Sequence, residues 1–301
     1  MSVSAAPKLG YIWNPADKTL RPILGVPGAS QLGESVTTPG AYEVAAADSM
    51  GKVALLLDEQ GGLYSMSLPA GSPVRIAGQA DKSSKIVFSP LGTAGMVFLP
   101  GSSQLTIVSD LQSVPQRRGV PSTGAVLDAT LSDAGSVAIA MKTSGTVSTR
   151  VLPTTGSATS LSPLKAYGGM TFIAGTDDLL LADAAANTLV RIRSASTSPD
   201  PLLVPTSGLL KAPVAIAVSR SARWAAVANS TDSSVIRVDL RGNTPPLRSA
   251  CDCQPTLVTQ LASEGAFRFT PLQDGPLWIG DASKTAFPVM FIPALAQAAF
   301  K

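Results

Sequence analysis

The feature that most constrains the fold is a unit of about 41 to 51 residues that recurs along the chain. Each unit begins with a short strand-like segment that ends in a turn rich in small and polar residues. A second segment follows each turn and is apolar almost throughout. The segments of the first kind are residues 44–47, 86–89, 129–132, 171–174, 216–219 and 267–270, and those of the second kind are 53–57, 96–99, 137–141, 179–182, 224–228 and 277–279.

Apolar runs this short predict strands that are buried on both faces, as in a sheet packed between two neighbouring sheets. A third segment alternates between apolar and polar residues, as in 63–68 and 235–240, and a fourth is short and irregular, as in 73–77. Burial that decreases from the second strand to the fourth is typical of a propeller blade. The sequence therefore predicts an all-β protein, a β-propeller of about six four-stranded blades, with a count of seven left open by a duplicated third strand.

The two ends of the chain depart from the repeat. Residues 11–14 and 20–24 resemble third and fourth strands without a first or second, and the last unit stops after a third strand at 288–292. Pairing of these N- and C-terminal strands in one blade would close the ring and remove the exposed sheet edges. We expect one propeller domain over residues 1–301, with closing strands in 9–27, repeats in 41–294 and a tail in 295–301.

Composition excludes several classes of protein. Charged residues make up 14% of the chain and apolar residues 45%, which argues against disorder. The net charge of +3 is scattered, so we expect no nucleic-acid partner. No run of 18 apolar residues is present, so no transmembrane segment is expected, and the first seven residues lack the features of a signal peptide.

The chain contains no histidine, which excludes Ser-His-Asp and Cys-His catalysis and histidine-ligated metal sites. Its two cysteines are Cys251 and Cys253. Two thiolates fall short of the four ligands of structural zinc, so we expect a local disulfide or a pair of thiols. A redox dithiol and a weak soft-metal site remain alternatives, and a disulfide here requires a tight bend. No metal and no cofactor are predicted.

Alignment of the predicted first strands places four charged residues around one mouth of a central channel. They are Glu43, Lys85, Asp128 and, two places further along its strand, Arg268. The plainest interpretation is a hydrated rim whose charges pair with each other. The same ring could bind a polar ligand, since clefts focus charge, or Glu43 and Asp128 could serve as a glycosidase-like acid and base.

Residues 214–219, 223–230 and 235–240 resemble the YVTN type of propeller repeat. The turn Phe88-Ser89-Pro90-Leu91-Gly92 is similar to that of tryptophan–aspartate and TolB-like repeats. Residues 20–28 and the Cys251-Asp252-Cys253 pair resemble predicted secreted propellers of acidobacteria. The resemblance covers most of the chain and implies a fold and an extracellular or periplasmic setting, but no activity.

Together these features favour a non-enzymatic propeller that binds a protein or a small polar ligand outside the cytoplasm. One alternative is a carbohydrate-active hydrolase or lyase that uses carboxylates at the channel mouth. Another is a structural module of a cell-surface assembly. The order of these hypotheses depends on whether the ring of charged residues exists.

Overall fold

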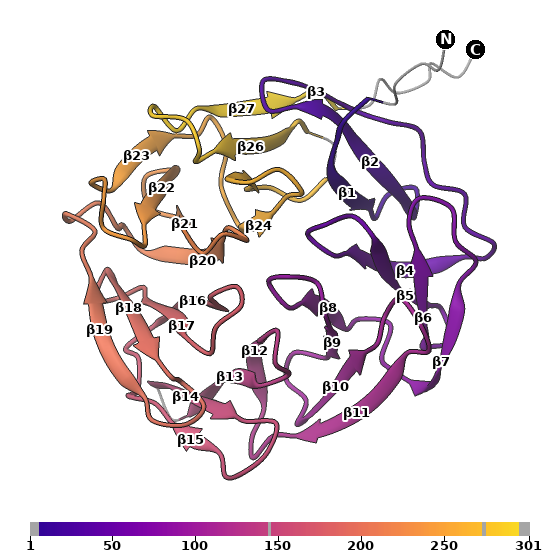
Figure 1. Ribbon diagram of the computed structural model, residues 1–301, viewed down its shortest axis with the longest axis horizontal. Coiled ribbons are helices and arrows are strands. Elements are labelled where there is room, and N and C mark those ends of the chain that lie inside the picture. The colour runs from indigo at the N-terminus through magenta and orange to yellow at the C-terminus, as the bar shows by residue number, and fades with distance from the viewer. Residues whose placement is uncertain (1–5, 144–145, 273–274, 295–301) are drawn as a thin grey trace.

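The computed structural model describes residues 6–143, 146–272 and 275–294, and all regular elements within these ranges are β-strands. The strands form seven separate antiparallel sheets, which lie around a common axis like the blades of a propeller (Figure 1). The all-β propeller is confirmed, and the number of blades is seven. In the described ranges no helix is long and apolar enough to cross a membrane.

The blades follow each other in chain order. Blade 1 contains β1–β3, blade 2 β4–β7, blade 3 β8–β11, blade 4 β12–β15, blade 5 β16–β19, blade 6 β20–β23 and blade 7 β24–β27. The innermost strands are β1 (Lys8–Asn14), β4 (Tyr42–Ala47), β8 (Lys85–Phe88), β12 (Val126–Leu131), β16 (Tyr167–Phe172), β20 (Pro213–Val218) and β24 (Thr259–Gln260). The second strands are β2 (Thr19–Val26), β5 (Val53–Asp58), β9 (Gly95–Phe98), β13 (Val137–Thr143), β17 (Leu179–Asp183), β21 (Trp224–Asn229) and β25 (Ala266–Arg268).

The outer strands complete each blade. The third strands are β3 (Ala29–Leu32), β6 (Gly62–Ser67), β10 (Gln104–Ser109), β14 (Thr146–Leu152), β18 (Thr188–Arg193), β22 (Ser234–Asp239) and β26 (Leu277–Asp281). The fourth strands are β7 (Val74–Gln79), β11 (Gln116–Pro121), β15 (Thr159–Ser160), β19 (Asp200–Val204), β23 (Leu247–Ala250) and β27 (Val289–Ile292). Blade 1 has no fourth strand among the described residues.

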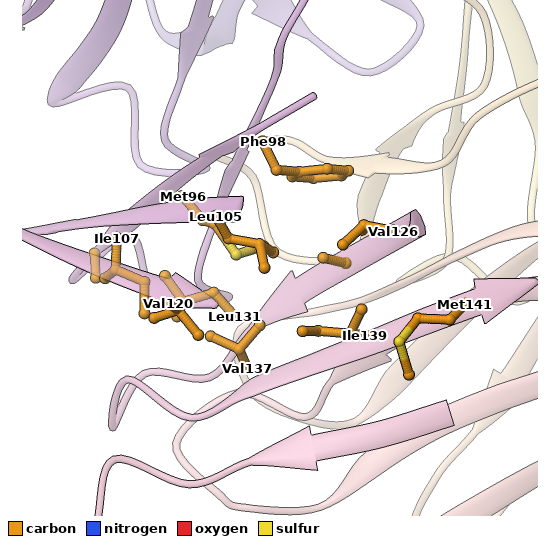
Figure 2. Packing of buried hydrophobic residues seen from close by; sticks show 12 residues of the cluster. Met96, Phe98, Leu105, Ile107, Val120, Val126, Leu131, Val137, Ile139 and Met141 are labelled. Carbon is orange, nitrogen blue, oxygen red and sulfur yellow. The ribbon is translucent and has the colours of Figure 1, made fainter. Parts of the chain in front are cut away.

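The second strands are buried on both faces because successive side chains point to opposite neighbouring blades. In β5, Leu55 and Leu57 pack against blade 3, whereas Ala54 and Leu56 pack against blade 1. One apolar cluster lies between each adjacent pair of blades, and Figure 2 shows the one between blades 3 and 4. The continuous apolar runs of the sequence follow from this packing, and burial decreases to the exposed β7 as expected.

The ring is not closed by a blade shared between the two chain ends, so this part of the prediction is wrong. The segments expected as third and fourth strands, residues 11–14 and 20–24, lie in β1 and β2 of blade 1, whose third strand is β3. In blade 7 the innermost position is occupied by β24. The segments predicted as its first, second and third strands are therefore β25, β26 and β27, the second, third and fourth strands of the blade. These two offsets account for the seventh blade.

The junction between blades 7 and 1 is held by face-to-face packing. Leu9, Ile12 and Ile23 of blade 1 pack against an apolar set in blade 7 that includes Leu277 and Ile292. One backbone hydrogen bond adds to this packing, from the N–H of Ala262 to the carbonyl of Leu9 at 2.6 Å. We call this junction the seam.

The strand β1 runs opposite to the other innermost strands. A Cβ built on Gly51, in the β4–β5 turn, would lie 3.2 Å from the ring of Tyr11 near the start of β1. At the other end, Lys18 in the β1–β2 turn contacts Glu43 near the start of β4. Strand directions alternate within a blade. A three-stranded blade whose first strand starts at one end of the axis therefore finishes at the same end as a four-stranded blade whose first strand starts at the other end. The reversed β1 therefore fits a three-stranded blade 1.

Candidate functional site

A recurrent hydrogen bond defines where each innermost strand ends. The residue that directly follows the strand donates its N–H to the carbonyl of the residue that starts the second strand or directly precedes it. The donor–acceptor pairs are Asp48–Val53, Ser89–Ala94, Ser132–Ser136, Ile173–Asp178, Ser219–Trp224 and Leu261–Ala266. In four of these turns the buried side chain also accepts N–H groups from the second strand, as Asp48 does from Lys52 and Val53 and as Ser219 does from Trp224. These turns all lie at one end of the axis, which we call the turn end.

Counting back from these turn residues gives two layers of side chains that line a central cavity of about 760 Å³. The layer two residues back contains Ala46, Val87, Thr130, Thr171, Ala217 and Thr259. The layer four residues back, nearer the open end where the innermost strands begin, contains Val44, Lys85, Asp128, Gly169, Ala215 and Leu257. The lining also includes Tyr167, Arg268 and residues 10–13 of β1.

Three polar side chains form a connected row on consecutive blades near the open end. The ammonium of Lys85 in blade 3 lies 3.8 Å from a carboxylate oxygen of Asp128 in blade 4. The other oxygen of Asp128 accepts a hydrogen bond of 2.6 Å from the hydroxyl of Tyr167 in blade 5. Burial, together with the charge of Asp128, raises the pKa of Tyr167 well above its ordinary value, so the phenol stays protonated and keeps donating. Asp128 is therefore held between two donors.

Glu43 does not belong to this ring. It lies five residues before the turn residue Asp48, not four, at a register shift between Tyr42 and Val44 where simple alternation does not hold. Its carboxylate pairs with Lys18 of blade 1 at 2.6 Å. Glu43 is also absent from the residues that line the cavity, so the structure does not bring Glu43 and Asp128 together as an acid–base pair.

Arg268 enters the cavity from β25, the second strand of blade 7, because β24 is only two residues long. It pairs with Thr259 across the β24–β25 ladder and donates to the Thr259 hydroxyl at 3.4 Å. Burial lowers the pKa of its guanidinium to about 10. Among the residues that the structure describes, no carboxylate lies within ion-pair distance of Arg268.

The turn end of the channel is crossed by another arginine. Arg220, in the turn after β20 of blade 6, contacts Met50 of blade 2 and the carbonyl of Ala262 in blade 7. Because blades 6 and 2 face each other across the axis, this side chain narrows the turn end.

The two cysteines form a disulfide, Cys251–Cys253, with the two Cα atoms 4.9 Å apart. Of the alternatives left open by the sequence, the structure shows the disulfide, and the tight bend brings the Cα atoms within the usual range. Cys251 is buried, and its N–H donates to the carbonyl of Ser233. The disulfide lies at the start of the segment that leads from the outer strand β23 inward to β24. It fixes that connection and lies outside the cavity lining.

One contributor to the site, Tyr167, is not among the residues that the sequence predicts. It lies beyond a register shift in β16, between Tyr167 and Met170, so strict alternation along the strand does not predict where its side chain lies. The pair Gly168-Gly169 in the printed sequence is the signal that could have revealed the irregularity.

Comparisons with known proteins agree with the β-propeller fold and establish no function. No protein-family model matches the chain, and no curated protein matches it. A functionally unknown protein from Desulfotomaculum acetoxidans DSM 771 is similar in structure, with a TM-score of 0.62 and 12% identity over 97% of this chain and 100% of that one. The predicted relation to YVTN repeats and to acidobacterial propellers has no counterpart in these comparisons and stays a prediction.

Two further solved structures are similar at the same level. Virginiamycin B lyase from Staphylococcus aureus has a TM-score of 0.58 and 12% identity over 85% of each chain. The β-propeller domain of Cps50 (Swd1) from Myceliophteria thermophila has a TM-score of 0.60 and 11% identity over 87% of this chain and 88% of that one. The chain thus has the β-propeller fold that an enzyme and a WD40-type protein also have.

Proposed function

We propose that this protein is a non-enzymatic propeller that binds a small polar ligand in its central channel. The observation that carries the proposal is the cavity itself. It has the volume of a small-molecule site, and its walls are largely apolar with a few polar groups that converge from different blades. Those groups are the row Lys85–Asp128–Tyr167 and the separate cation Arg268.

The enzymatic alternative is weaker. A glycosidase needs two carboxyl groups that flank one bond, and Glu43 points away from the cavity toward Lys18. A catalytically inactive form of virginiamycin B lyase has a histidine replaced by alanine, whereas the present chain contains no histidine. A binding role needs neither a second carboxylate nor a histidine.

The proposal includes an extracellular or periplasmic setting. The disulfide Cys251–Cys253 supports it, because disulfides persist in oxidising compartments and are rare in the cytosol. A protein partner on the outer surface and a role within a cell-surface assembly remain alternatives, but no described contact favours either of them over the cavity.

The test is a thermal-shift screen with sugars, polyols, amino acids and organic acids, followed by calorimetry on each compound that raises Tm. The variant Ala46→Trp places a large ring at a cavity-lining position without changing any charge. We expect compounds that bind the wild-type protein to lose binding in Ala46→Trp. The matched control is Ala70→Trp, in the exposed turn between β6 and β7. Binding that survives Ala46→Trp, or turnover of a compound by the wild-type protein, would contradict the proposal.

A further inference from the structure

Arg268 differs from the other charged residues of the cavity because no described side chain balances its charge. Lys85 has Asp128 at 3.8 Å. Asp48, at the turn end, is occupied by the backbone N–H groups of Met50, Lys52 and Val53. Arg268 has only the 3.4 Å hydrogen bond to Thr259. Among the described residues, Arg268 is therefore the charged residue of the cavity lining that has neither an ion pair nor a set of short hydrogen bonds.

A half-buried cation without a partner costs free energy, because desolvation of the charge is not repaid by an opposite charge. Charged groups that are perturbed by desolvation in a cleft are concentrated at functional sites. With a pKa of about 10 the guanidinium remains charged at neutral pH. Its planar fork of N–H donors matches a carboxylate in geometry.

The strand β1, next to Arg268 across the seam, adds backbone donors. The carbonyls of Leu20 and Pro22 in β2 accept hydrogen bonds from Val36 and Gly33, so the backbone groups of these two residues face away from β1. Their partners in the β1–β2 ladder are Trp13 and Tyr11. These are non-hydrogen-bonded pairs of the antiparallel ladder, in which the backbone N–H and C=O groups of both residues point away from the partner strand. The N–H and C=O groups of Tyr11 and Trp13 therefore point away from β2.

The outward direction for β1 is toward the axis, because β1 is the innermost strand of blade 1 and residues 10–13 line the cavity. The carbonyl of Leu9, two residues before Tyr11, reaches Ala262 of blade 7 from the same edge. One wall of the cavity therefore combines an unbalanced guanidinium with a strand edge that offers N–H donors.

We propose that the channel ligand is a small organic monoanion whose carboxylate pairs with Arg268, while its uncharged part extends toward Asp128 and Tyr167. The inference rests on the proposed function and adds the chemical class of the ligand. A single cation without a described partner suits one carboxylate better than a doubly charged phosphate. The hydroxyl of Tyr167 and the carboxylate of Asp128 are suited to polar groups at the far end of the ligand.

The experiment is calorimetry with matched pairs of compounds that differ only in charge: acetate, butyrate, benzoate and glutamate, each compared with its amide. The proteins are the wild type, Arg268→Met and the control Arg75→Met, which removes the same charge from the exposed outer strand β7. We expect at least one carboxylate to bind the wild type and Arg75→Met. Loss of a charge-assisted pair should weaken its binding by about 10- to 100-fold in Arg268→Met, and its amide should bind the wild type correspondingly weakly.

A second readout separates binding from a structural role. Removal of an unpaired, half-buried charge should leave the Tm of the ligand-free Arg268→Met protein equal to or above that of the wild type. A clear drop in this Tm would mean that Arg268 supports the fold, and it would overturn the inference. Arg268→Lys keeps the charge without the planar fork, and we expect intermediate binding.

The outcomes distinguish this inference from the proposed function. If neutral sugars or amides bind in a manner that Ala46→Trp blocks and no carboxylate in the panel binds better than its amide, the channel is a binding site but the inference is wrong. If a carboxylate binds equally well to the wild type and to Arg268→Met, the inference is also wrong. If no compound binds at all, both proposals fail.

Discussion

Asp133 offers a sharp test of how neighbouring blades are held in register at the turn end. It lies in the β12–β13 turn of blade 4. One carboxylate oxygen accepts the N–H of Leu91 in blade 3 at 2.8 Å, and the other accepts the N–H of Gly175 in blade 5 at 2.9 Å. A single side chain thus ties three consecutive blades together.

The expected magnitude follows from these two bonds. A hydrogen bond to a charged group contributes about 1.5 to 3 kcal/mol, and solvent competes for both bonds here, so about 1 kcal/mol for each is appropriate. Asp133→Ala should therefore lower the free energy of unfolding by about 2 kcal/mol, and Tm by roughly 3 °C for a chain of this size. Asp133→Asn keeps one acceptor oxygen and should lose about half as much.

Urea unfolding followed by circular dichroism, together with calorimetry, measures both quantities. Glu59→Ala is the control, because Glu59 is an exposed carboxylate in the turn after β5 and has no hydrogen bond with a described residue. The reasoning fails if Asp133→Ala unfolds within 0.5 kcal/mol of the wild type, a margin that covers ordinary surface substitutions. It also fails if Asp133→Asn loses as much stability as Asp133→Ala.

Three further predictions concern the backbone, the disulfide and the buried phenol. Gly169 has a φ of +109°, and a Cβ there would lie 3.0 Å from the Cα of Ala215, so Gly169→Ala should cost roughly 2 kcal/mol in urea unfolding. Reduction of Cys251–Cys253 should add two free thiols by mass spectrometry after alkylation and cost only about 1.5 kcal/mol, because the closed loop has three residues. The raised pKa of Tyr167 contributes stability that is fully present below the ordinary tyrosine pKa of about 10 and is lost as pH rises through the folded value. Tyr167→Phe should therefore remove the last phase of the ultraviolet titration and flatten the fall of stability above pH 10, and an unchanged titration would show that the phenol is not buried.

Repeats and apolar runs were sufficient to predict the blades, because every second strand lies between two neighbouring sheets. Blade 7 was misassigned because β24 has only two residues, and no periodicity can be recognised in so short a strand. Without β24, each later segment moved one place inward, and the surplus N-terminal strands were assigned to a shared blade. The misassignment of the strands in blade 7 therefore has one local cause, the short strand β24.

Local features of single strands and turns also decided which residues of the site could be predicted. The structure places Lys85 and Asp128 in the cavity lining, four residues before Ser89 and Ser132, which hold the turns that the sequence suggested. In blade 2 the sequence suggests Ala47 as the strand-ending residue, whereas the buried carboxylate of Asp48 holds the turn. That offset of one residue, together with the register shift at Glu43, leaves Glu43 outside the cavity lining. The ligand-binding role of these residues stays a prediction.

The seam gives the ring a preferred place to open. Six junctions join blades that follow each other directly along the chain, whereas the seventh joins blade 7 to blade 1 across the largest sequence separation in the molecule. Because side-chain packing and the Ala262–Leu9 hydrogen bond hold it, blades 1 and 7 can part without breaking any sheet. Amides of β1 and β24 should then exchange with solvent earlier than those of β12 and β16, and a ligand seated against β1 would slow that exchange from within the channel.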